Sequence, residues 1–467
     1  MEKTIAPKTP PKKDYSIGNA LKYGNGITRL SGIILGLGNM CRKQVQKGLC
    51  FLCSELLYIY YMVAFGGSSI VNFITLGTVQ QQEVFNEELG IYEYMLGDNS
   101  MLCLLYGVVT LFITAFFIML MIASVKSAYH AQRDIEEGRN PATFGKDLFE
   151  LKDNNLHLTL LTLPTLGVIL FTIIPLVFMI FIAFTNYDKN HLPPGKLFDW
   201  VGLENFKNVV SIGGSSSSSR GIGSTFFPVL AWTLVWAVFA TFTNYFLGMI
   251  LALLINRKGT KAKGFWRFNF VLSIAIPAFV SLLTMRTIFS ESGPVNVLLR
   301  QWGVIDSSYS VPFWTDGGLA KVMVILVNIW IGVPYTMLQV TGILQNIPHE
   351  LYEAADVEGA NAFTKFFKIT LPYMFFVTGP YLITTFIGNI NNFNVIFLLT
   401  GGGPGNLDYY YAGKTDLLVT WLYKLTMTEK DYKMGSVIGI MIFIISAVFS
   451  LIAYRHTAAY KNEESFQ

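Results

Sequence analysis

FFPVLAWTLVWAVFATFTNYFLGMILALLI, residues 226–255, is a run of apolar side chains without one Asp, Glu, Lys or Arg. A helix needs about 20 mainly apolar residues to cross the hydrocarbon core of a bilayer, where no water is present to bond to the backbone. The run is longer than that. It therefore predicts a transmembrane helix and places the chain among the integral membrane proteins.

Stretches of similar composition recur along the chain, which has 467 residues, 52% of them hydrophobic and 14% charged. The further predicted spans are residues 49–65, 101–124, 159–184, 268–289, 322–344, 373–399 and 435–454. The segment 27–40 is apolar but too short to cross, so we expect an interfacial or re-entrant helix there. The sequence thus predicts an all-α polytopic integral membrane protein with about eight transmembrane helices.

The basic residues predict the orientation, because Lys and Arg accumulate in short cytoplasmic loops. They crowd residues 1–48, 126–152 and 257–267. Residues 66–100 contain no Lys or Arg and carry the carboxylates Glu83, Glu87, Glu88, Glu93 and Asp98. We expect this acidic loop outside the cell and both termini in the cytoplasm, and the N-terminal sequence does not resemble a cleavable signal peptide.

The chain divides by composition into a cytoplasmic N-terminal segment (1–48), a first pair of spans (49–158), a third span with an external connector (159–225), a dense block of spans (226–456) and a cytoplasmic tail (457–467). The connector, residues 186–225, contains the low-complexity tract 213–219 of glycines and serines. Such a tract cannot bury a core, so we expect a flexible connector.

The cysteines and the basic residues argue against a metal-binding, a disulfide-bonded or a nucleic-acid-binding protein. The cysteines Cys41, Cys50, Cys53 and Cys103 lie in or beside apolar segments, which favours membrane-helix positions over a metal site or a disulfide. The net charge of +4 comes from the basic loops, and no basic stripe indicates nucleic-acid binding.

Two charged residues within the spans are interpreted without a transport role. Arg286 is expected to reach the headgroups at the external end of its span. Glu55 could serve a proton relay, but no partner His or carboxylate lies near it in the sequence.

Residues 412–415, AGKT, end like the phosphate-binding loop G-x-x-x-x-G-K-[ST]. The first glycine of that pattern would stand at Asp408, and no buried strand precedes the segment. We therefore predict no ATP binding by this chain, and no catalytic or metal site.

The most informative stretch is HELYEAADVEGANAFTKFFKITLP, residues 349–372, on the predicted cytoplasmic side. Pro348 suits a helix start, Gly359 permits a sharp break before a second short helix, and Pro372 is expected to end that helix. Small residues before the break let another protein approach closely, and phenylalanines after it supply apolar anchors. We predict a docking knob; the alternative is an ordinary amphipathic loop helix.

Within residues 346–372, the order of small, acidic and apolar positions resembles the EAA loop of ABC importer permeases. The matching residues are Glu353, Ala354, Ala355, Gly359, Ile369, Leu371 and Pro372. The resemblance implies a type I ABC importer permease core in residues 226–456, in a bacterial cell membrane. It also implies that the loop seats in a cleft of a separate ATPase dimer and transmits its closure to the membrane helices. The partner would use ATP and Mg, and this chain would bind no cofactor and catalyse no reaction.

Further segments resemble the MalF-type maltose and maltodextrin permeases: FTNY (184–187), WVGLENF (200–206), NIWIGVPY (328–335), NNF (391–393), LTGGGP (399–404) and AGKTDLL (412–418). The resemblance covers most of the chain from Thr159 onward. It implies maltose or maltodextrin as substrate and, as partners, a second MalG-type permease, an ATPase dimer and an extracellular solute-binding protein. Some of these relatives have a large folded insertion where this chain has only residues 186–225, so contacts with the binding protein are expected to differ.

The same resemblance implies a sugar site at Asn328, Ile331, Gly332, Tyr335, Thr385, Gly388, Asn389 and Asn392. Amides suit sugar hydroxyls, and Tyr335 is the candidate stacking ring. Spacings of four and three place Thr385, Asn389 and Asn392 on one helix face. Gly388 departs from the aromatic residue that the family can have there, which implies a wider cavity and longer maltodextrins. The alternative is that the asparagines only bond neighbouring helices.

Three functions thus remain open at this point. The first is an ABC importer permease for maltodextrins or another oligosaccharide. The second is a secondary sugar transporter, which would need inverted repeats and an ion site. The third is a membrane enzyme, although no nucleophile, base and metal cluster converges in the sequence.

Overall fold

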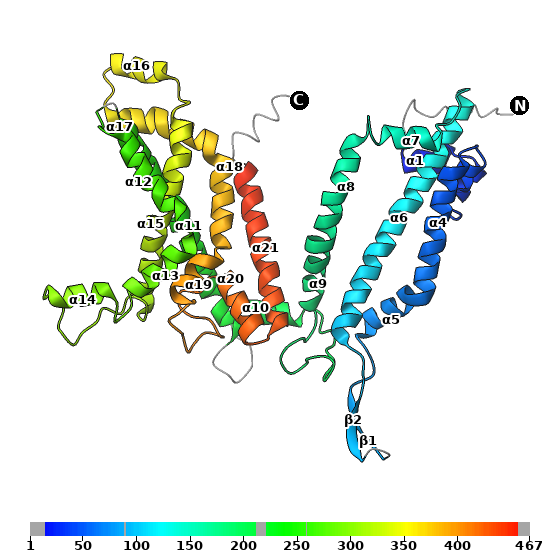
Figure 1. Cartoon of the computed structure of the whole chain (residues 1–467), viewed down its shortest axis with the longest axis horizontal. Coiled ribbons are helices and arrows are strands. Elements are labelled where there is room, and N and C mark those ends of the chain that lie inside the picture. Colours follow the sequence, from blue (N-terminus) through cyan, green and yellow to red (C-terminus); the bar gives the residue numbers. More distant parts are fainter. Residues whose placement is uncertain (1–14, 88–89, 212–220, 258, 456–467) are drawn as a thin grey trace, which may run out of the picture. The chain divides into compact units, whose positions relative to one another are not determined.

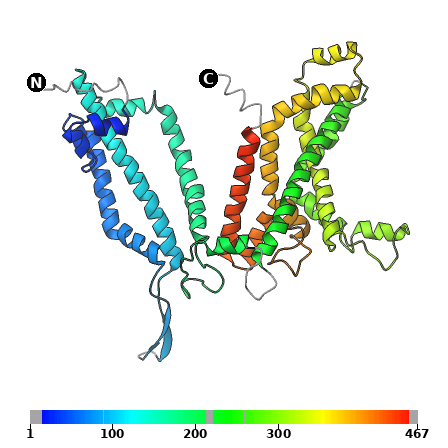
Figure 2. The same cartoon turned by 180° about the vertical axis from the view of Figure 1, so that it is seen from behind.

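The computed structural model describes residues 15–87, 90–211, 221–257 and 259–455. The chain divides into two compact units, Met1–Trp200 and Val201–Gln467, and each consists mainly of long helices (Figure 1 and, from behind, Figure 2). The division falls within the segment 159–225 that the composition set apart.

The first unit contains α1 (Ile17–Tyr23), α2 (Gly26–Leu30), α3 (Leu37–Met40), α4 (Val45–Tyr61), the π-helical turn η1 (Met62–Gly66), α5 (Gly67–Thr75), β1 (Gln82–Asn86), β2 (Ile91–Met95), α6 (Ser100–Glu136), α7 (Phe144–Glu150), α8 (Leu156–Val168), the π-helical turn η2 (Ile169–Ile173) and α9 (Ile174–Ile182). The antiparallel pair β1–β2 is the one departure from an all-α fold among the described residues.

The second unit contains α10 (Glu204–Val210), α11 (Ile222–Asn256), α12 (Lys263–Ala275), α13 (Ala278–Ile288), α14 (Pro294–Gln301), α15 (Gly317–Leu344), α16 (His349–Val357), α17 (Ala362–Lys365), the π-helical turn η3 (Phe366–Thr370), α18 (Leu371–Ile390), α19 (Phe393–Thr400), α20 (Leu418–Tyr423), the π-helical turn η4 (Lys424–Thr428) and α21 (Tyr432–Arg455).

The predicted number of spans is confirmed. Among the described residues, seven helices are long and apolar enough to cross a membrane, and the bent pair α12–α13 makes eight when it is counted as one span. The span predicted for 268–289 corresponds to this bent pair rather than to one continuous helix, because the chain bends by 88° between Ala275 and Ala278. Ile276 there is extended, at φ −79° and ψ 124°, as the residue before a proline prefers to be.

The predicted span 373–399 also differs in its ends. Pro372 does not end a helix, since α17, η3 and α18 follow one another without a gap and Pro372 lies in the first turn of α18. Proline removes one backbone donor from this run, and the π-helical turn η3 directly before it already departs from the i→i−4 bonding pattern there. At the other end, α18 stops at Ile390 and α19 begins only at Phe393.

The segment 27–40 forms the short helices α2 and α3, neither long enough to span. The turn between them is fixed by Glu55, whose carboxylate accepts a hydrogen bond of 2.8 Å from the Leu35 amide. Arg42, which is buried, donates to the Thr28 hydroxyl and to the Ala128 carbonyl of α6. Glu55 thus has a structural partner that its sequence context did not indicate.

Residues 186–211 of the predicted flexible connector are ordered, whereas the glycine and serine tract lies outside the described residues. Phe198 and Val209 of this segment are fully buried. The Asp199 amide donates to the Asn186 side chain at 2.7 Å, which closes a loop within the first unit. The prediction of a flexible connector is therefore wrong for these residues.

The core of the second unit lies along α11 and α15. Trp232, Trp236 and Val327 are buried together in one cluster, and Tyr245 and Met337 in a second one further along the same helices. Gly248 permits the close approach, because a Cβ there would lie 2.7 Å from the Thr336 side chain. A small residue at a helix crossing is typical of packing within membranes.

Candidate functional site

Three helices of the second unit, α11, α15 and α18, enclose a cavity of about 150 Å³. Its lining is Ala240, Thr241, Asn244, Tyr245, Gly332, Tyr335, Thr336, Tyr381, Leu382, Thr385 and Asn389. Four of the eight predicted sugar-site residues, Gly332, Tyr335, Thr385 and Asn389, are therefore brought together from two helices. The walls combine aromatic rings with amide and hydroxyl groups, a mixture that suits a polyhydroxylated ligand.

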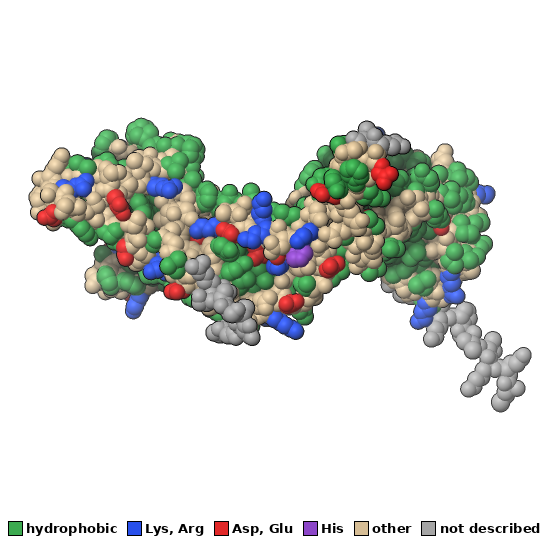
Figure 3. Space-filling model, turned by 90° about the horizontal axis from the view of Figure 1, so that it is seen from below, with side chains coloured by type: hydrophobic (Ala, Val, Ile, Leu, Met, Phe, Trp, Pro, Cys, Tyr) green, Lys and Arg blue, Asp and Glu red, His purple; other side chains and the backbone are tan. Residues whose placement is uncertain are grey.

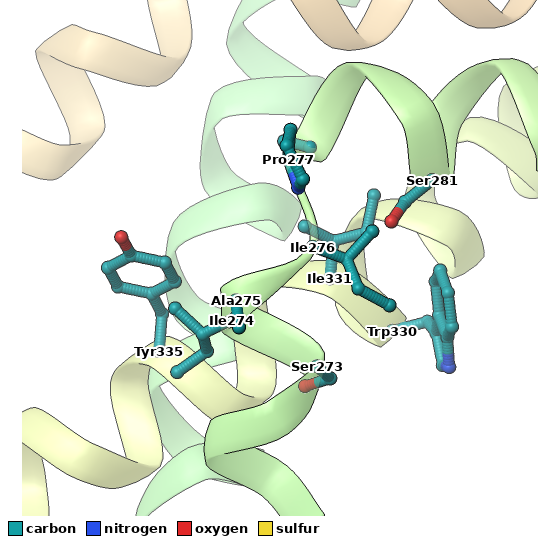
Figure 4. Close-up of a pocket in the computed structure, with 10 residues that line it drawn as sticks. Ser273, Ile274, Ala275, Ile276, Pro277, Ser281, Trp330, Ile331 and Tyr335 are labelled. Carbon is teal, nitrogen blue, oxygen red and sulfur yellow. The ribbon is translucent and has the colours of Figure 1, made fainter.

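A second cavity of about 260 Å³ lies at the bend between α12 and α13 (Figure 4). Figure 4 shows Tyr335 and Trp330 at opposite ends of its lining, with Ile276 and Ile331 between them. Tyr335 borders both cavities, and its side chain is 57% exposed. The cavity at the bend near Pro277 and the cavity between α11, α15 and α18 thus lie on two sides of Tyr335.

The polar stripe predicted on one helix face is only partly present. Thr385 and Asn389 lie on α18, but Asn392 lies beyond its end and caps α19, where it accepts a bond of 3.2 Å from the Val395 amide. Its side chain donates to the Asn389 side chain at 3.3 Å. The placement of all three on one helix is wrong, because the spacing rule assumed a helix that continues.

Asn389 also bonds neighbouring helices, as the alternative interpretation expected. Its Nδ2 donates to the Thr241 hydroxyl at 2.9 Å, and its carbonyl accepts from the Trp236 indole at 3.1 Å. Both partners are on α11. The side chain also lines the cavity, so its position is compatible with both interpretations.

The remaining predicted residues lie outside the first cavity. Asn328 is buried on α15, and its Nδ2 has no hydrogen-bond partner among the described residues. Ile331 lines only the second cavity. Gly388 is exposed, and a Cβ there would meet nothing within 4 Å, so an aromatic residue has room at this position.

The sequence interpretation missed the wall that α11 supplies. Asn244 approaches Gly332 so closely that a Cβ at residue 332 would lie 2.2 Å from its Nδ2. The Oδ1 of Asn244 is buried, with no hydrogen-bond partner among the described residues. The available signal was a polar amide in the middle of an otherwise apolar span, which is costly there and commonly functional.

The helix and the break that were predicted for the docking knob are both present. α16 begins after Pro348, and Gly359 has the left-handed φ of +75° that glycine adopts most readily. Asn361 then caps α17 by accepting a bond of 2.8 Å from the Thr364 amide. Figure 1 shows α16 projecting beyond the ends of α15 and α17.

The knob exposes the residues that the motif identified. Glu353, Ala354, Gly359 and Pro372 are exposed, whereas Ala355, Ile369 and Leu371 are half-buried. Apolar side chains surround them: Leu351 is 47% exposed, Val357 90%, Phe363 73% and Phe367 48%. Lys365 pairs with Asp356 across the break, and Tyr352 shares a hydrogen bond of 2.9 Å with Thr370. The fold therefore holds an apolar surface in place without covering it.

The AGKT segment has no free phosphate cradle. The Gly413 amide donates to the carboxylate of Asp416 at 2.7 Å, and Asp416 is fully buried. Lys424 pairs with the same carboxylate at 2.5 Å. The backbone that a phosphate would need is thus occupied by an internal acid.

Comparison with known proteins assigns the family. Residues 244–460 match the family described as binding-protein-dependent transport system inner membrane component. The maltodextrin transport system permease protein MdxF of Bacillus subtilis (strain 168) is 34% identical over 446 residues, 93% of this chain and 96% of the relative. The chain belongs to this transporter family.

The permease has other relatives, which are named for more than one substrate. The galactooligosaccharides transport system permease protein GanP of Bacillus subtilis (strain 168) is 35% identical over 94% of this chain and 99% of the relative. The maltose/maltodextrin transport system permease protein MalF of Salmonella typhimurium is 35% identical over 58% of this chain and 52% of the relative. The match to MdxF extends the predicted resemblance into the N-terminal region.

Solved structures confirm the fold of the permease. A bacterial ABC transporter that imports the acidic polysaccharide alginate matches with a TM-score of 0.51 at 21% identity, over 66% of this chain and 96% of that one. The permease is thus a multi-pass membrane protein with the fold of an ABC importer subunit, and its relatives are transport subunits rather than enzymes.

Proposed function

We propose that this permease is one of two membrane subunits of an ATP-driven importer that takes maltodextrins from an extracellular solute-binding protein. A second permease completes the pathway, and a separate ATPase dimer binds ATP and Mg against the loop 346–372. Both termini lie in the cytoplasm, as the basic loops predict.

One observation supports this proposal above the others: a single run of helix joins the knob to the cavity. α17, η3 and α18 are continuous from Ala362 to Ile390, so the residues that follow Gly359 and the cavity residues Thr385 and Asn389 belong to one run of helix, which turns on its way from α17 down α18 (Figures 1 and 2). A displacement of the knob by a partner is carried to the cavity wall. Alternating access needs such a mechanical connection between the two sites.

The cavity supports an uncharged, hydroxyl-rich solute. Its lining contains no Asp, Glu, Lys or Arg, while Tyr335, Tyr381 and Tyr245 supply rings and the amides of Asn244 and Asn389 supply donors and acceptors. An acidic sugar would leave its carboxylate without a cationic partner there. We therefore favour neutral oligosaccharides, and the match to MdxF favours maltodextrins among them.

The experiment is ATP-dependent uptake of labelled maltotriose into vesicles that contain the permease, its partner permease, the ATPase and the binding protein. A galactooligosaccharide, glucose and an unrelated disaccharide are compared in parallel. Uptake of maltotriose alone supports the proposal. Uptake of the galactooligosaccharide in its place keeps the importer and replaces the substrate, and uptake that survives loss of the ATPase would indicate a secondary transporter.

The site is tested with Asn389→Ala and Thr385→Val against Asn391→Ala. Asn391 is the matched control, because it is an exposed amide at the end of the same helix and bonds only within that helix. We expect the two cavity variants to lower uptake at limiting sugar about tenfold or more, which corresponds to about 1.4 kcal/mol. Unchanged uptake in an assembled complex would remove the assignment.

A further inference from the structure

The hairpin β1–β2 of the first unit exposes large apolar side chains on both of its faces. The register pairs Glu83 with Tyr94 and Phe85 with Tyr92, which places one acidic and three aromatic side chains on one face. Phe85 is 49% exposed, Tyr92 68% and Tyr94 65%. The opposite face carries Val84, Ile91 and Met95, which are 46%, 53% and 65% exposed.

The stem of this hairpin is held firmly. The Asp98 carboxylate accepts bonds of 2.7 and 2.9 Å from the Thr78 and Val79 amides, and the Asp98 amide donates to the Val79 carbonyl at 2.7 Å. These amide bonds hold the pKa of Asp98 below its usual range. The base of the hairpin is thus fixed by hydrogen bonds while both of its faces are exposed. This arrangement fits a rigid protruding arm better than a flexible loop.

Figure 1 shows the hairpin projecting beyond the ends of α5 and α6, away from α1 and α7. Figure 3 looks at the molecule from the end toward which the hairpin points, and hydrophobic side chains cover wide areas between the charges there. The hairpin interrupts a loop without Lys or Arg, so the positive-inside rule assigns it to the external side.

A two-stranded hairpin in water is marginally stable by itself, and its outer strand edges present unpaired backbone groups. Exposed Tyr and Phe side chains are also the residues that dominate the energy of protein interfaces. Both features indicate a surface that a partner covers. The charge of the hairpin is negative only: Glu83 lies on one face and Glu93 on the other, and residues 66–100 contain no Lys or Arg.

Two other occupants fit less well. Lipid hydrocarbon would have to accept Glu83 and Glu93, and buried carboxylates without a partner are costly. A sugar chain prefers a flat aromatic platform, but the rings of Phe85 and Tyr92 meet at 60° with their centroids 5.1 Å apart. A protein groove accommodates inclined rings and can place cations against the two glutamates.

We propose that the β1–β2 hairpin is the external arm by which this permease docks its solute-binding protein, through an apolar groove edged by Lys or Arg on that partner. The inference rests on the proposed importer function and names the surface by which this chain would contact its binding protein.

The test uses vesicles with the complete importer and measures uptake as a function of the binding-protein concentration. The double variant Phe85→Ser/Tyr92→Ser should raise the concentration needed for half-maximal uptake about tenfold or more. Maximal uptake and the ATPase rate without binding protein should stay unchanged. Phe149→Ser is the matched control, because this exposed phenylalanine of α7 lies at the opposite end of the same unit.

Reversal of the charge with Glu83→Lys/Glu93→Lys should weaken docking and reverse its dependence on salt, because salt then screens a repulsion instead of an attraction. If the wild-type complex is active and both variants need the same binding-protein concentration for half-maximal uptake as the wild type, the docking role of the hairpin is wrong. The proposed importer function would be unaffected by that result. A wild-type complex without any uptake would instead contradict the proposed function. Photo-crosslinks from residue 92 to lipid alone would assign the hairpin to the membrane surface.

Discussion

The loop 346–372 and the hairpin β1–β2 both protrude and both expose aromatic side chains, but only the loop could be recognised from the sequence. Phe363 of the loop is 73% exposed and Tyr92 of the hairpin 68%, and neither ring is covered by the chain itself. The loop follows a family motif, so its role could be expected from residue order. The hairpin has no such motif, and its exposed faces become visible only when register and burial are known.

The two parts also differ in how they join the rest of the molecule. The loop continues as an unbroken helix into the cavity wall at Asn389, whereas the hairpin is attached through the turn that Asp98 holds. A force on the loop would therefore be carried by helix to the cavity wall, whereas the proposed contact at the hairpin has no such continuous helix behind it. We expect variants of the loop to change coupling and variants of the hairpin to change affinity.

The largest expected effect is at the break of the loop. Gly359→Val places a β-branched side chain at φ +75°, which costs about 1–3 kcal/mol in strain and changes the direction of the chain. We expect sugar-stimulated ATP hydrolysis and uptake to fall more than tenfold. Gly264→Val on α12 is the control, since a Cβ there also meets nothing within 4 Å and the backbone is helical. If the Gly359 variant kept normal sugar-stimulated ATP hydrolysis, the break at Gly359 would not be needed for coupling.

A smaller and more selective effect is expected from Phe363→Ser. Loss of an aromatic anchor at an interface commonly costs about 2 kcal/mol, or roughly 30-fold in affinity. The measurement is the fraction of the ATPase that stays bound when the complex is purified. The hairpin variant Phe85→Ser/Tyr92→Ser should leave that fraction unchanged, and Phe363→Ser should leave the half-maximal binding-protein concentration unchanged. If each variant moved both quantities, the division of labour between loop and hairpin would be wrong.

The smallest effect is expected at the stem of the hairpin. Asp98→Asn removes the charge that the Thr78 and Val79 amides stabilise, so these amides should exchange their hydrogens several-fold faster. The folded pKa of Asp98 is lowered, hence its contribution is present above the ordinary value of about 3.9 and is lost as the pH falls through the folded pKa. Wild-type exchange protection should therefore be constant from neutral to mildly acidic pH. Protection that already falls near neutral pH would contradict this assignment.

The length of apolar runs made the spans predictable, but not their interruptions. Pro277 breaks its helix, whereas Pro334 and Pro380 lie inside unbroken ones, so the residue type alone does not decide. Neighbouring helices can satisfy the backbone around a proline within a membrane, and that compensation depends on packing. The same limit explains Asn392, whose place outside α18 follows from the chain's turn rather than from its spacing.

The cavity was predictable only where the family motif reaches. Gly332, Tyr335, Thr385 and Asn389 were found through resemblance, whereas Asn244 and Thr241 come from a helix without a motif. Their contribution depends on how closely α11 approaches α15, which the sequence does not state. The hairpin was missed for a related reason: alternation over five residues is a weak signal beside strong apolar runs.

The continuity of α18 also sets a scale for motion. Its 20 residues span about 30 Å at about 1.5 Å per residue, so a tilt of about 4° at the loop end displaces the far end by about 2 Å. A hydrogen bond is lost over about that distance. Under the proposed function, a slight rotation at the loop end of α18 would then decide whether Asn389 bonds Thr241 or turns its amide to the solute.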